Sequence, residues 1–424
     1  MQTLTSSLSN MSQTAIKLPA IDFEKIRKDF PVLHQDVNGH PLVYLDNAAS
    51  SQMPVQVAER IDHYHRYEHS NVHRGIHTLS QKATDAYELT RKKVAQFINA
   101  ASHDEIVFTS GTTDSINLVA NSYGLTNFRE GDEIILSEME HHANIVPWQM
   151  IAEKTGAVIK VIPVTDSGDL DMEAYKKLLG SRTKMVAVIH LSNALGTVNP
   201  VKEITDLAHD HGAVVLIDGA QSVPHTKVDM QEIGCDFFTF SAHKMCGPTG
   251  FGILYGKKTL LDSMPPYRGG GDMIDKVSFE ETTYNVPPFR FEAGTPPIAA
   301  GIGLSASIDY INGIGIDAIA DREDKLVTYA ADRLREVEGL RFIGDSETRA
   351  SVCAFVFDEI HASDMGTILD KRGIAVRTGH HCAQPILRRF NVPATTRASV
   401  SFYNTEEDID RLIDGIYYAK SFFE

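Results

Sequence analysis

Lys244 is the candidate for a reactive amine in this sequence. It follows the aromatic, strand-prone run 236–240, and Gly247, Pro248 and Gly250 end the segment. A lysine buried at the mouth of a strand has a lowered pKa, so its free amine can form a Schiff base with an aldehyde. Taken alone, Lys244 could instead be a solvent-facing residue in a turn.

Asp218 is a second candidate because it ends a wholly apolar run, residues 214–217, and is followed in the same D-G-A-Q segment by Gln221. A buried carboxylate needs a partner, and the protonated ring nitrogen of a bound cofactor would be one. A salt bridge to a neighbouring loop is the alternative.

The segment Ser110–Thr113 lies between a predicted strand and a predicted helix. Gly111 allows the backbone to approach a ligand closely, the flanking hydroxyls can donate, and a helix N-terminus favours an anion. The segment therefore predicts a phosphate cup. An ordinary helix N-cap is the alternative interpretation.

His141 follows another predicted strand, in the segment E-M-E-H-H. A histidine there could stack on an aromatic cofactor and shuttle protons near neutral pH. A metal site competes with this interpretation, since the chain has 18 histidines. However, the adjacent pair His141 and His142 has no histidine four residues on and no H-E-x-x-H arrangement, which disfavours a metal.

Cys382 lies in the polar segment R-T-G-H-H-C, next to an arginine and two histidines. Cationic neighbours favour the thiolate, which is the nucleophilic form of cysteine. Cys235 and Cys353 lie in apolar runs and are predicted core residues. Cys246, two residues after Lys244, fits either interpretation.

Three further cations could hold an anion. Arg397 enters a predicted strand near the C-terminus, from which it could clamp a carboxylate across an interdomain cleft, or form a surface ion pair. His73 and Arg74 lie in a loop that interrupts the helical pattern between residues 55 and 98. They could bind an anion, or the loop could simply cap the helices.

Seven apolar, strand-like runs alternate with amphipathic helical patterns between residues 105 and 255. This alternation predicts an α/β fold with a mainly parallel seven-stranded sheet covered by helices on both faces. Ligands of such sheets bind beyond the carboxyl ends of the strands. The candidate residues of this region follow strands in that way.

The chain is expected to divide into four parts. We predict a disordered tail over residues 1–20, an N-terminal segment over 21–40 that packs with the smaller domain, a large cofactor-binding domain over 41–299, and a smaller α+β domain over 300–424 that carries Cys382. Helices are expected over residues 22–30 and 316–338, and a polar loop over 377–382.

Composition excludes several classes of function. The 424 residues carry a net charge of -16, which repels phosphate backbones and anionic lipid and disfavours nucleic-acid and membrane roles. No apolar run is long enough to span a membrane, and the first residues resemble neither a secretion signal nor a transit peptide. The four cysteines form no C-x-x-C pair. We predict a cytoplasmic protein.

From about residue 21 to the C-terminus, the sequence resembles the class V aminotransferase-like enzymes, which depend on pyridoxal 5'-phosphate (PLP) and have fold type I. Within them it is similar to the group II, or SufS-type, cysteine desulfurases. The motifs that carry the resemblance are Y-L-D-N-A-A, N-V-H-R-G, S-G-T-T, E-H-H-A-N, L-S-N-A-L-G, D-G-A-Q, S-A-H-K, F-E-A-G-T-P, R-T-G-H-H-C-A and R-A-S. The short loop around the cysteine favours group II.

The resemblance implies a role for each cofactor residue. Lys244 would hold PLP covalently and move the Cα proton of the substrate. Asp218 would pair with the pyridine nitrogen, Gln221 would reach the phenolic oxygen, and His141 would stack over the ring and exchange the thiol proton. The implied phosphate-binding residues are Thr112, Thr113, Ser241 and His243, with Thr295 from the other subunit of a homodimer.

The resemblance also implies how the substrate binds and reacts. Arg397, assisted by Asn193, would hold the carboxylate of L-cysteine, and Cys382 would attack its sulfur to give an enzyme persulfide and alanine. Residues implied on the substrate or persulfide side are His73, Arg74 and Arg377. One departure from the family pattern is Met245–Cys246, where a leucine and an aromatic residue are expected after the lysine.

The implied partner is a SufE-like or SufU-like protein that accepts the sulfur for iron-sulfur cluster assembly. Selenocysteine lyase activity is a close variant. One alternative is another class V PLP enzyme, an aminotransferase or a kynureninase-like lyase, which would leave Cys382 without a role. A non-catalytic scaffold that docks sulfur-transfer proteins is the other.

Overall fold

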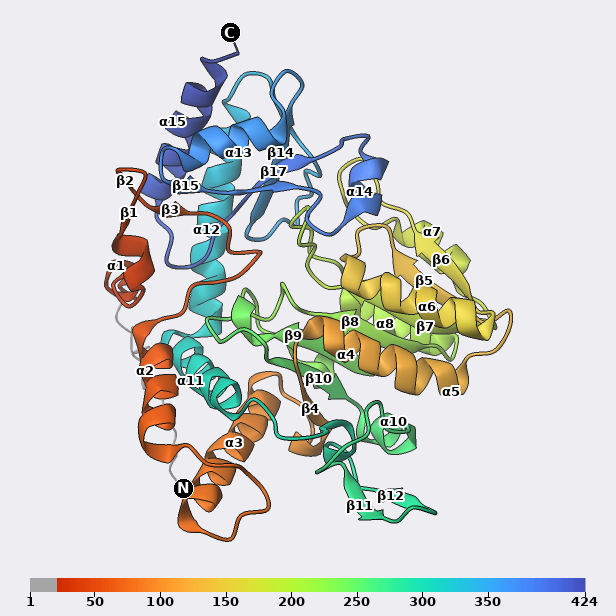
Figure 1. Cartoon of the computed structure of the whole chain (residues 1–424). Coiled ribbons are helices and arrows are strands. Elements are labelled where there is room, and N and C mark those ends of the chain that lie inside the picture. The colour runs from red at the N-terminus through yellow and green to blue at the C-terminus, as the bar shows by residue number, and fades with distance from the viewer. Residues whose placement is uncertain (1–20, 424) are drawn as a thin grey trace, which may run out of the picture.

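A seven-stranded sheet forms the centre of the larger part of the molecule (Figure 1). The structure is a computed structural model and describes residues 21–423, so the tail predicted over residues 1–20 lies outside the described residues. The strands, in chain order, are β4 (Ile106–Thr109), β5 (Glu133–Ser137), β6 (Val158–Ile162), β7 (Thr183–Ile189), β8 (Val214–Asp218), β9 (Phe237–Ser241) and β10 (Gly252–Gly256).

The spatial order of these strands is β4-β10-β9-β8-β7-β5-β6. β10 is antiparallel to both of its neighbours, and every other neighbouring pair is parallel. The predicted α/β fold with a mainly parallel sheet is therefore confirmed. The carboxyl ends of β5, β7, β8 and β9 meet at one edge of the sheet.

Except along the edge strand β6, both faces of this sheet are buried. Successive side chains of a strand point to opposite faces. On β5, for example, Ile134 and Leu136 pack into one apolar cluster and Ile135 into the other. The first cluster includes the helices α4 (Thr112–Val119) and α6 (Val146–Thr155). The second includes α3 (Thr78–Phe97), α8 (Val201–Asp210) and α11 (Ile298–Ile314). Burial on both faces explains why the strand sequences are continuous apolar runs.

A second, antiparallel sheet lies toward the C-terminus, in the order β13-β14-β17-β16. Its strands are β13 (Leu340–Phe342), β14 (Val352–Phe357), β16 (Arg377–Gly379) and β17 (Thr395–Ser399). The helices α12 (Ile316–Arg335), α13 (Ala362–Asp370) and α15 (Glu406–Lys420) pack with it in a separate apolar cluster. The short helix α14 (Gln384–Arg389) follows Cys382.

The N-terminal segment contacts these C-terminal elements. Helix α1 (Phe23–Arg27) is capped by Asp22, and Arg27 forms an ion pair of 2.9 Å with Asp408 on α15. Strand β3 (Val43–Tyr44) pairs in parallel with β15 (Ile374–Ala375). The division of the chain into independently folding domains stays a prediction.

The remaining elements connect these layers. They are β1 (Asp36–Val37), β2 (His40–Pro41), α2 (Val55–His63), α5 (Leu125–Asn127), α7 (Met172–Leu178), α9 (Met230–Ile233), α10 (Lys258–Ser263), β11 (Ile274–Val277) and β12 (Thr282–Tyr284). Within residues 21–423, every helix is too short or too polar to cross a membrane.

Three expected boundaries differ from the structure. The helix expected over residues 22–30 is only Phe23–Arg27, and the one expected over 316–338 ends at Arg335. The loop expected over 377–382 begins instead as strand β16, because Arg377–Gly379 pair with the backbone of β17. This pairing joins segments that are distant in the sequence, so local composition gave no signal for it.

Candidate active site

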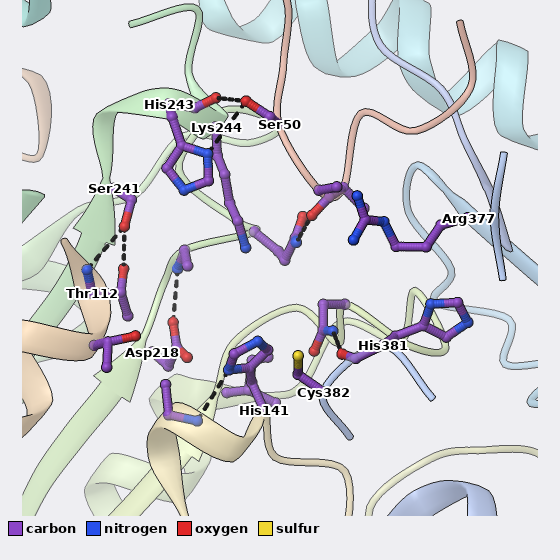
Figure 2. Close-up of a pocket in the computed structure, with 18 of the residues that line it drawn as sticks. Ser50, Thr112, His141, Asp218, Ser241, His243, Lys244, Arg377, His381 and Cys382 are labelled. Atoms are coloured by element: carbon purple, nitrogen blue, oxygen red, sulfur yellow. Dashed lines mark hydrogen bonds between the residues drawn. The ribbon is translucent and has the colours of Figure 1, made fainter. Parts of the chain in front are cut away.

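A cavity of about 350 Å³ lies beyond the carboxyl ends of the parallel strands. It brings together all of the predicted site residues except His73, Arg74 and Thr295. Those that line it are Thr112, Thr113, His141, Asn193, Asp218, Gln221, Ser241, His243, Lys244, Arg377, Cys382 and Arg397. Figure 2 shows the Lys244 amine and the Cys382 sulfur pointing into the cavity from opposite sides.

Lys244 ends a single helical turn, Ala242–Lys244, that directly follows β9. Burial lowers the pKa of its amine to about 8, and the positive charge of Arg397 acts in the same direction, while Asp218 opposes both. The lowered pKa expected for a lysine at the mouth of a strand is thus found here. An amine of this kind is neutral often enough near neutral pH to attack a carbonyl carbon.

Asp218 is the last residue of β8 and is 2% exposed. Its carboxyl accepts a hydrogen bond of 2.9 Å from the Ala220 amide. Burial raises the pKa of this carboxyl, against the effect of Lys244. Nearby, the Gln221 side chain donates to the Ala48 carbonyl at 2.6 Å. A carboxylate so placed favours a cationic group in the cavity.

The first turn of α4 borders the cavity, which Thr112 and Thr113 line. The cap residue of α4 is Gly111, with φ of 148°, so the cap position itself carries no side chain. The Ser241 hydroxyl accepts a hydrogen bond from the Thr112 amide and bonds the Thr112 hydroxyl, both at 2.9 Å. The hydroxyls of Ser110, Thr112 and Thr113 do not occupy the cap position, and Thr112 and Thr113 line the cavity. The phosphate cup stays a prediction.

His141 precedes a short helical turn, His142–Asn144, and caps it. Its Nδ1 accepts a hydrogen bond of 3.0 Å from the Ala143 amide, so the proton of the neutral ring is on Nε2. Burial lowers the pKa of the ring to about 4, helped by the charge of Lys244. His141 is therefore neutral at physiological pH, and it lines the same cavity as Cys382 (Figure 2).

Cys382 has an exposed thiol, whereas the other three cysteines are buried. Both His381 and Cys382 adopt left-handed backbone conformations, with φ of 50° and 54°. The segment is held by the Asn193 side chain, which donates to the His381 carbonyl at 2.7 Å, and by a contact of 2.7 Å between the His381 ring and the Thr395 hydroxyl. The buried state of Cys235 and Cys353 agrees with their predicted place in the core.

Two arginines share one carboxylate, that of Asp46. Arg397 is 2% exposed and donates to Asp46 at 3.2 Å and to the Asn193 carbonyl at 2.7 Å. Arg377 is more exposed and approaches both oxygens of Asp46. Arg397 is thus part of a buried network rather than a surface ion pair, and burial lowers its pKa to about 10.

Asp46 was missed by the sequence analysis, although it stands in the quoted motif Y-L-D-N-A-A. Its position directly after an apolar run is the same signal that singled out Asp218. Ser50 was also missed: its hydroxyl lies 3.3 Å from the His243 ring. Its type and neighbours in the sequence gave no comparable signal.

Three predicted residues do not line this cavity. His73 contacts Glu88 at 2.9 Å, Arg74 contacts Asp272 at 2.8 Å, and Thr295 is exposed. A contribution of Thr295 to the site of a second subunit stays a prediction. In the part of the chain that the structure describes, no group of three histidine, cysteine or carboxylate side chains is arranged to hold a metal ion.

The family model and the similar proteins found for this chain agree with one another. A family model described as aminotransferase class-V matches residues 43–412. A probable cysteine desulfurase of Halalkalibacterium halodurans is 53% identical over 399 residues, which cover 94% of this chain and 98% of that protein. A cysteine desulfurase of Dickeya dadantii is 53% identical over 395 residues, covering 93% and 96% of the two chains.

Solved structures agree with these sequence matches. The crystal structure of the cysteine desulfurase CsdA (S-sulfonic acid) from Escherichia coli superposes with a TM-score of 0.89 at 39% identity. The superposition covers 96% of this chain and 100% of that one.

Proposed function

Because the chain belongs to the aminotransferase class-V family, we propose that it is a PLP-dependent cysteine desulfurase that converts L-cysteine to L-alanine and keeps the sulfur as a persulfide on Cys382. The observation that carries this proposal is the placement of Cys382 and Lys244 in one cavity. Relatives that are 53% identical over almost their whole length are named cysteine desulfurases, which supports it.

PLP is the cofactor, and the residues of the cavity fit it. Lys244 offers an amine of lowered pKa to the aldehyde, Asp218 a buried carboxyl to the ring nitrogen, and the start of α4 an anion site to the phosphate. Arg397, Asn193 and His381 line the cavity, and each has a buried polar atom without a hydrogen-bond partner among the described residues. When bound, PLP supplies an electron sink for the carbon atoms of the substrate.

Substrate binding is assigned to the cations near Cys382. The guanidinium of Arg397, which lines the cavity, binds the carboxylate of L-cysteine. Asn193 lies beside it, since the Asn193 carbonyl accepts from Arg397. His73, Arg74 and Arg377 are proposed for the substrate or persulfide side of the site.

Proton transfers are assigned to Lys244 and His141. With a pKa of about 8, the Lys244 amine can both take and return a proton at the substrate Cα near neutral pH. The neutral His141 ring donates from Nε2 toward the substrate sulfur, and Nε2 is the ring atom at which the thiol proton would be exchanged, because the Ala143 amide occupies Nδ1.

Sulfur transfer is assigned to Cys382. Its thiolate forms a bond with the substrate sulfur while the carbon–sulfur bond of the substrate breaks. The carbon fragment keeps the electron pair of that bond, takes up protons and leaves as alanine. The product on the enzyme is a Cys382 persulfide, so no outside oxidant is needed.

The persulfide sulfur then passes to an acceptor protein of the SufE or SufU type, for iron-sulfur cluster assembly. We propose a cytoplasmic homodimer of the SufS-type subgroup, in which Thr295 of one subunit reaches the phosphate site of the other. Selenocysteine lyase activity is proposed as a variant of the same chemistry. The exposed position of Cys382 supports transfer to a partner.

The deciding experiment is turnover of L-cysteine by the wild type and by Cys382→Ala, with alanine and sulfane sulfur measured together. The wild type should give the two products in equal amounts, and Cys382→Ala should give neither while still binding PLP. Cys246→Ser is the matched control, because it removes the thiol nearest in sequence to Lys244. Full turnover by Cys382→Ala would favour another class V reaction, such as transamination or kynureninase-like cleavage. A wild type that binds no PLP would favour a scaffold.

A further inference from the structure

We propose that His142 is a positioning residue for the nucleophilic thiol, which it serves by holding the backbone at Cys382 and just after it, at Gln384. This inference rests on the proposed role of Cys382. His142 was noted in the sequence only as the neighbour of His141, and it does not line the cavity. It therefore acts through the Cys382 segment and not on the substrate.

Two hydrogen bonds carry the argument. The backbone amide of His142 donates to the Cys382 carbonyl at 2.7 Å. The ring of the same residue accepts from the Gln384 amide through Nε2, at 3.1 Å. A third contact is with the His380 ring, whose centroid lies 6.1 Å away. His142 thus contacts the ring of His380 before Cys382, the carbonyl of Cys382 itself and the amide of Gln384 after it.

The Cys382 segment requires such support. Two consecutive non-glycine residues, His381 and Cys382, have positive φ angles of 50° and 54°. This region is unfavourable for a residue that carries a side chain, so the conformation persists only if its surroundings fix it. Asn193 fixes the His381 carbonyl, and His142 fixes the next carbonyl along the chain.

The ring of His142 also replaces a missing helix cap. Gln384 is the first residue of α14, and the residue before it, Ala383, supplies no side-chain cap. The His142 ring accepts the first amide of that helix in its place. Burial and the neighbouring His380 lower the pKa of the His142 ring, which keeps Nε2 free to accept.

This arrangement ties together the two groups that handle sulfur. His141 and His142 are adjacent, so the segment that orients the His141 ring also holds the Cys382 backbone. Both His141 and Cys382 line the cavity (Figure 2). Loss of the His142 ring should displace the thiol relative to His141, and a displacement of about 1 Å is enough to cost on the order of 100-fold in rate.

The test compares His142→Ala with His142→Gln in the PLP-loaded enzyme. The alanine variant keeps the backbone amide but lacks the ring acceptor, whereas the glutamine variant restores an acceptor at similar reach. For His142→Ala we expect kcat with L-cysteine to fall about 10- to 100-fold, while KM changes less than about threefold. For His142→Gln we expect kcat to recover to within about threefold of the wild type. His103→Ala, at an exposed and distant histidine, is the control.

A second readout does not depend on turnover. Alkylation of Cys382 by iodoacetamide, followed by mass spectrometry of its peptide, should change in rate in His142→Ala and return toward the wild-type rate in His142→Gln. Hydrogen exchange of the peptide that contains Gln384 should be faster in His142→Ala. Unchanged alkylation and exchange would overturn the proposal. So would a glutamine variant that is as slow as the alanine variant.

The two readouts separate this proposal from the proposed function. If Cys382 is not the nucleophile, Cys382→Ala turns over normally, and His142→Ala changes alkylation without changing kcat. That combination overturns the desulfurase reaction, while the changed alkylation still shows that His142 holds the Cys382 segment. If only the positioning role is wrong, Cys382→Ala is inactive and His142→Ala behaves like the wild type in both readouts.

Discussion

The side-chain amide of Asn193 donates a hydrogen bond of 2.7 Å to the carbonyl of His381, the residue before the exposed thiol. The backbone carbonyl of Asn193 accepts a hydrogen bond from the buried guanidinium of Arg397, also at 2.7 Å. Asn193 therefore joins the proposed carboxylate site to the Cys382 segment. Its side-chain oxygen is buried and has no hydrogen-bond partner among the described residues.

Replacing Asn193 should slow sulfur transfer. In Asn193→Ala the His381 carbonyl loses its donor, and the Cys382 segment loses one of the contacts that fix its positive φ angles. We expect kcat with L-cysteine to fall about 10- to 100-fold. The steady-state rate of alanine formation is the measurement. Asn127→Ala, which removes an exposed helical amide, should behave like the wild type; equal rates for both variants would contradict the prediction.

The lowered pKa of Lys244 should make the stability of the cofactor-free protein depend on pH. Between about pH 8 and the ordinary value of 10.5, the unfolded chain keeps a proton that the folded chain has lost. The contribution of Lys244 to the free energy of unfolding therefore rises with pH over that window, by at most about 1.4 kcal/mol per pH unit.

Lys244→Met lacks this dependence and is the comparison. Urea unfolding at several pH values should show Lys244→Met more stable than the wild type near pH 7, with the difference shrinking as the pH rises from 8 to 10.5. A difference that stays constant over this range would show that the Lys244 amine is not shifted.

Glu140 should make the free energy of unfolding depend on pH in the opposite direction. It is fully buried, its carboxyl accepts from the Ile189 amide at 2.9 Å and from the Asn144 side chain at 2.7 Å, and burial raises its pKa to about 8. Between about pH 4.5 and 8 the folded chain keeps a proton that the unfolded chain has lost, so stability from Glu140 falls as the pH rises.

Glu140→Gln mimics the protonated acid and does not titrate. Its free energy of unfolding should therefore increase relative to the wild type from pH 5 to pH 8, by at most about 1.4 kcal/mol per pH unit. Glu153→Gln, at an exposed position of α6, should follow the wild type. Parallel curves for the wild type and Glu140→Gln would refute the shift.

Glu323 on α12 should be important for stability. Its buried carboxylate contacts the His225 ring at 2.7 Å and accepts from the Phe402 amide at 2.9 Å and the Ser401 hydroxyl at 3.2 Å. Glu323→Ala leaves these groups buried without their partner, which should cost at least about 2 kcal/mol. Asp324→Ala, at the next and exposed position, should change stability by less than about 0.5 kcal/mol. Urea unfolding midpoints at pH 7 compare the two.

The local pattern of the sequence was sufficient for the main features of the fold. Continuous apolar runs alternate with amphipathic ones, and only a sheet buried on both faces fits that pattern, so the strand ends could be located. Lys244 and Asp218 could be selected because each follows such a run. Their shifted pKa values have the cause expected from that position, which is burial at the edge of the sheet.

The tertiary structure alone decided which distant residues share a contact. Asp46 lies 351 positions from Arg397, and His142 lies 242 positions from Gln384, so neither pair leaves a trace in local composition. Strand β16 likewise exists only through its pairing with β17. The sequence determined the chemical groups and the strands that carry them, because these depend on local burial patterns. The folded chain determined how the thiol segment is held, because that depends on hydrogen bonds between segments that only folding brings together.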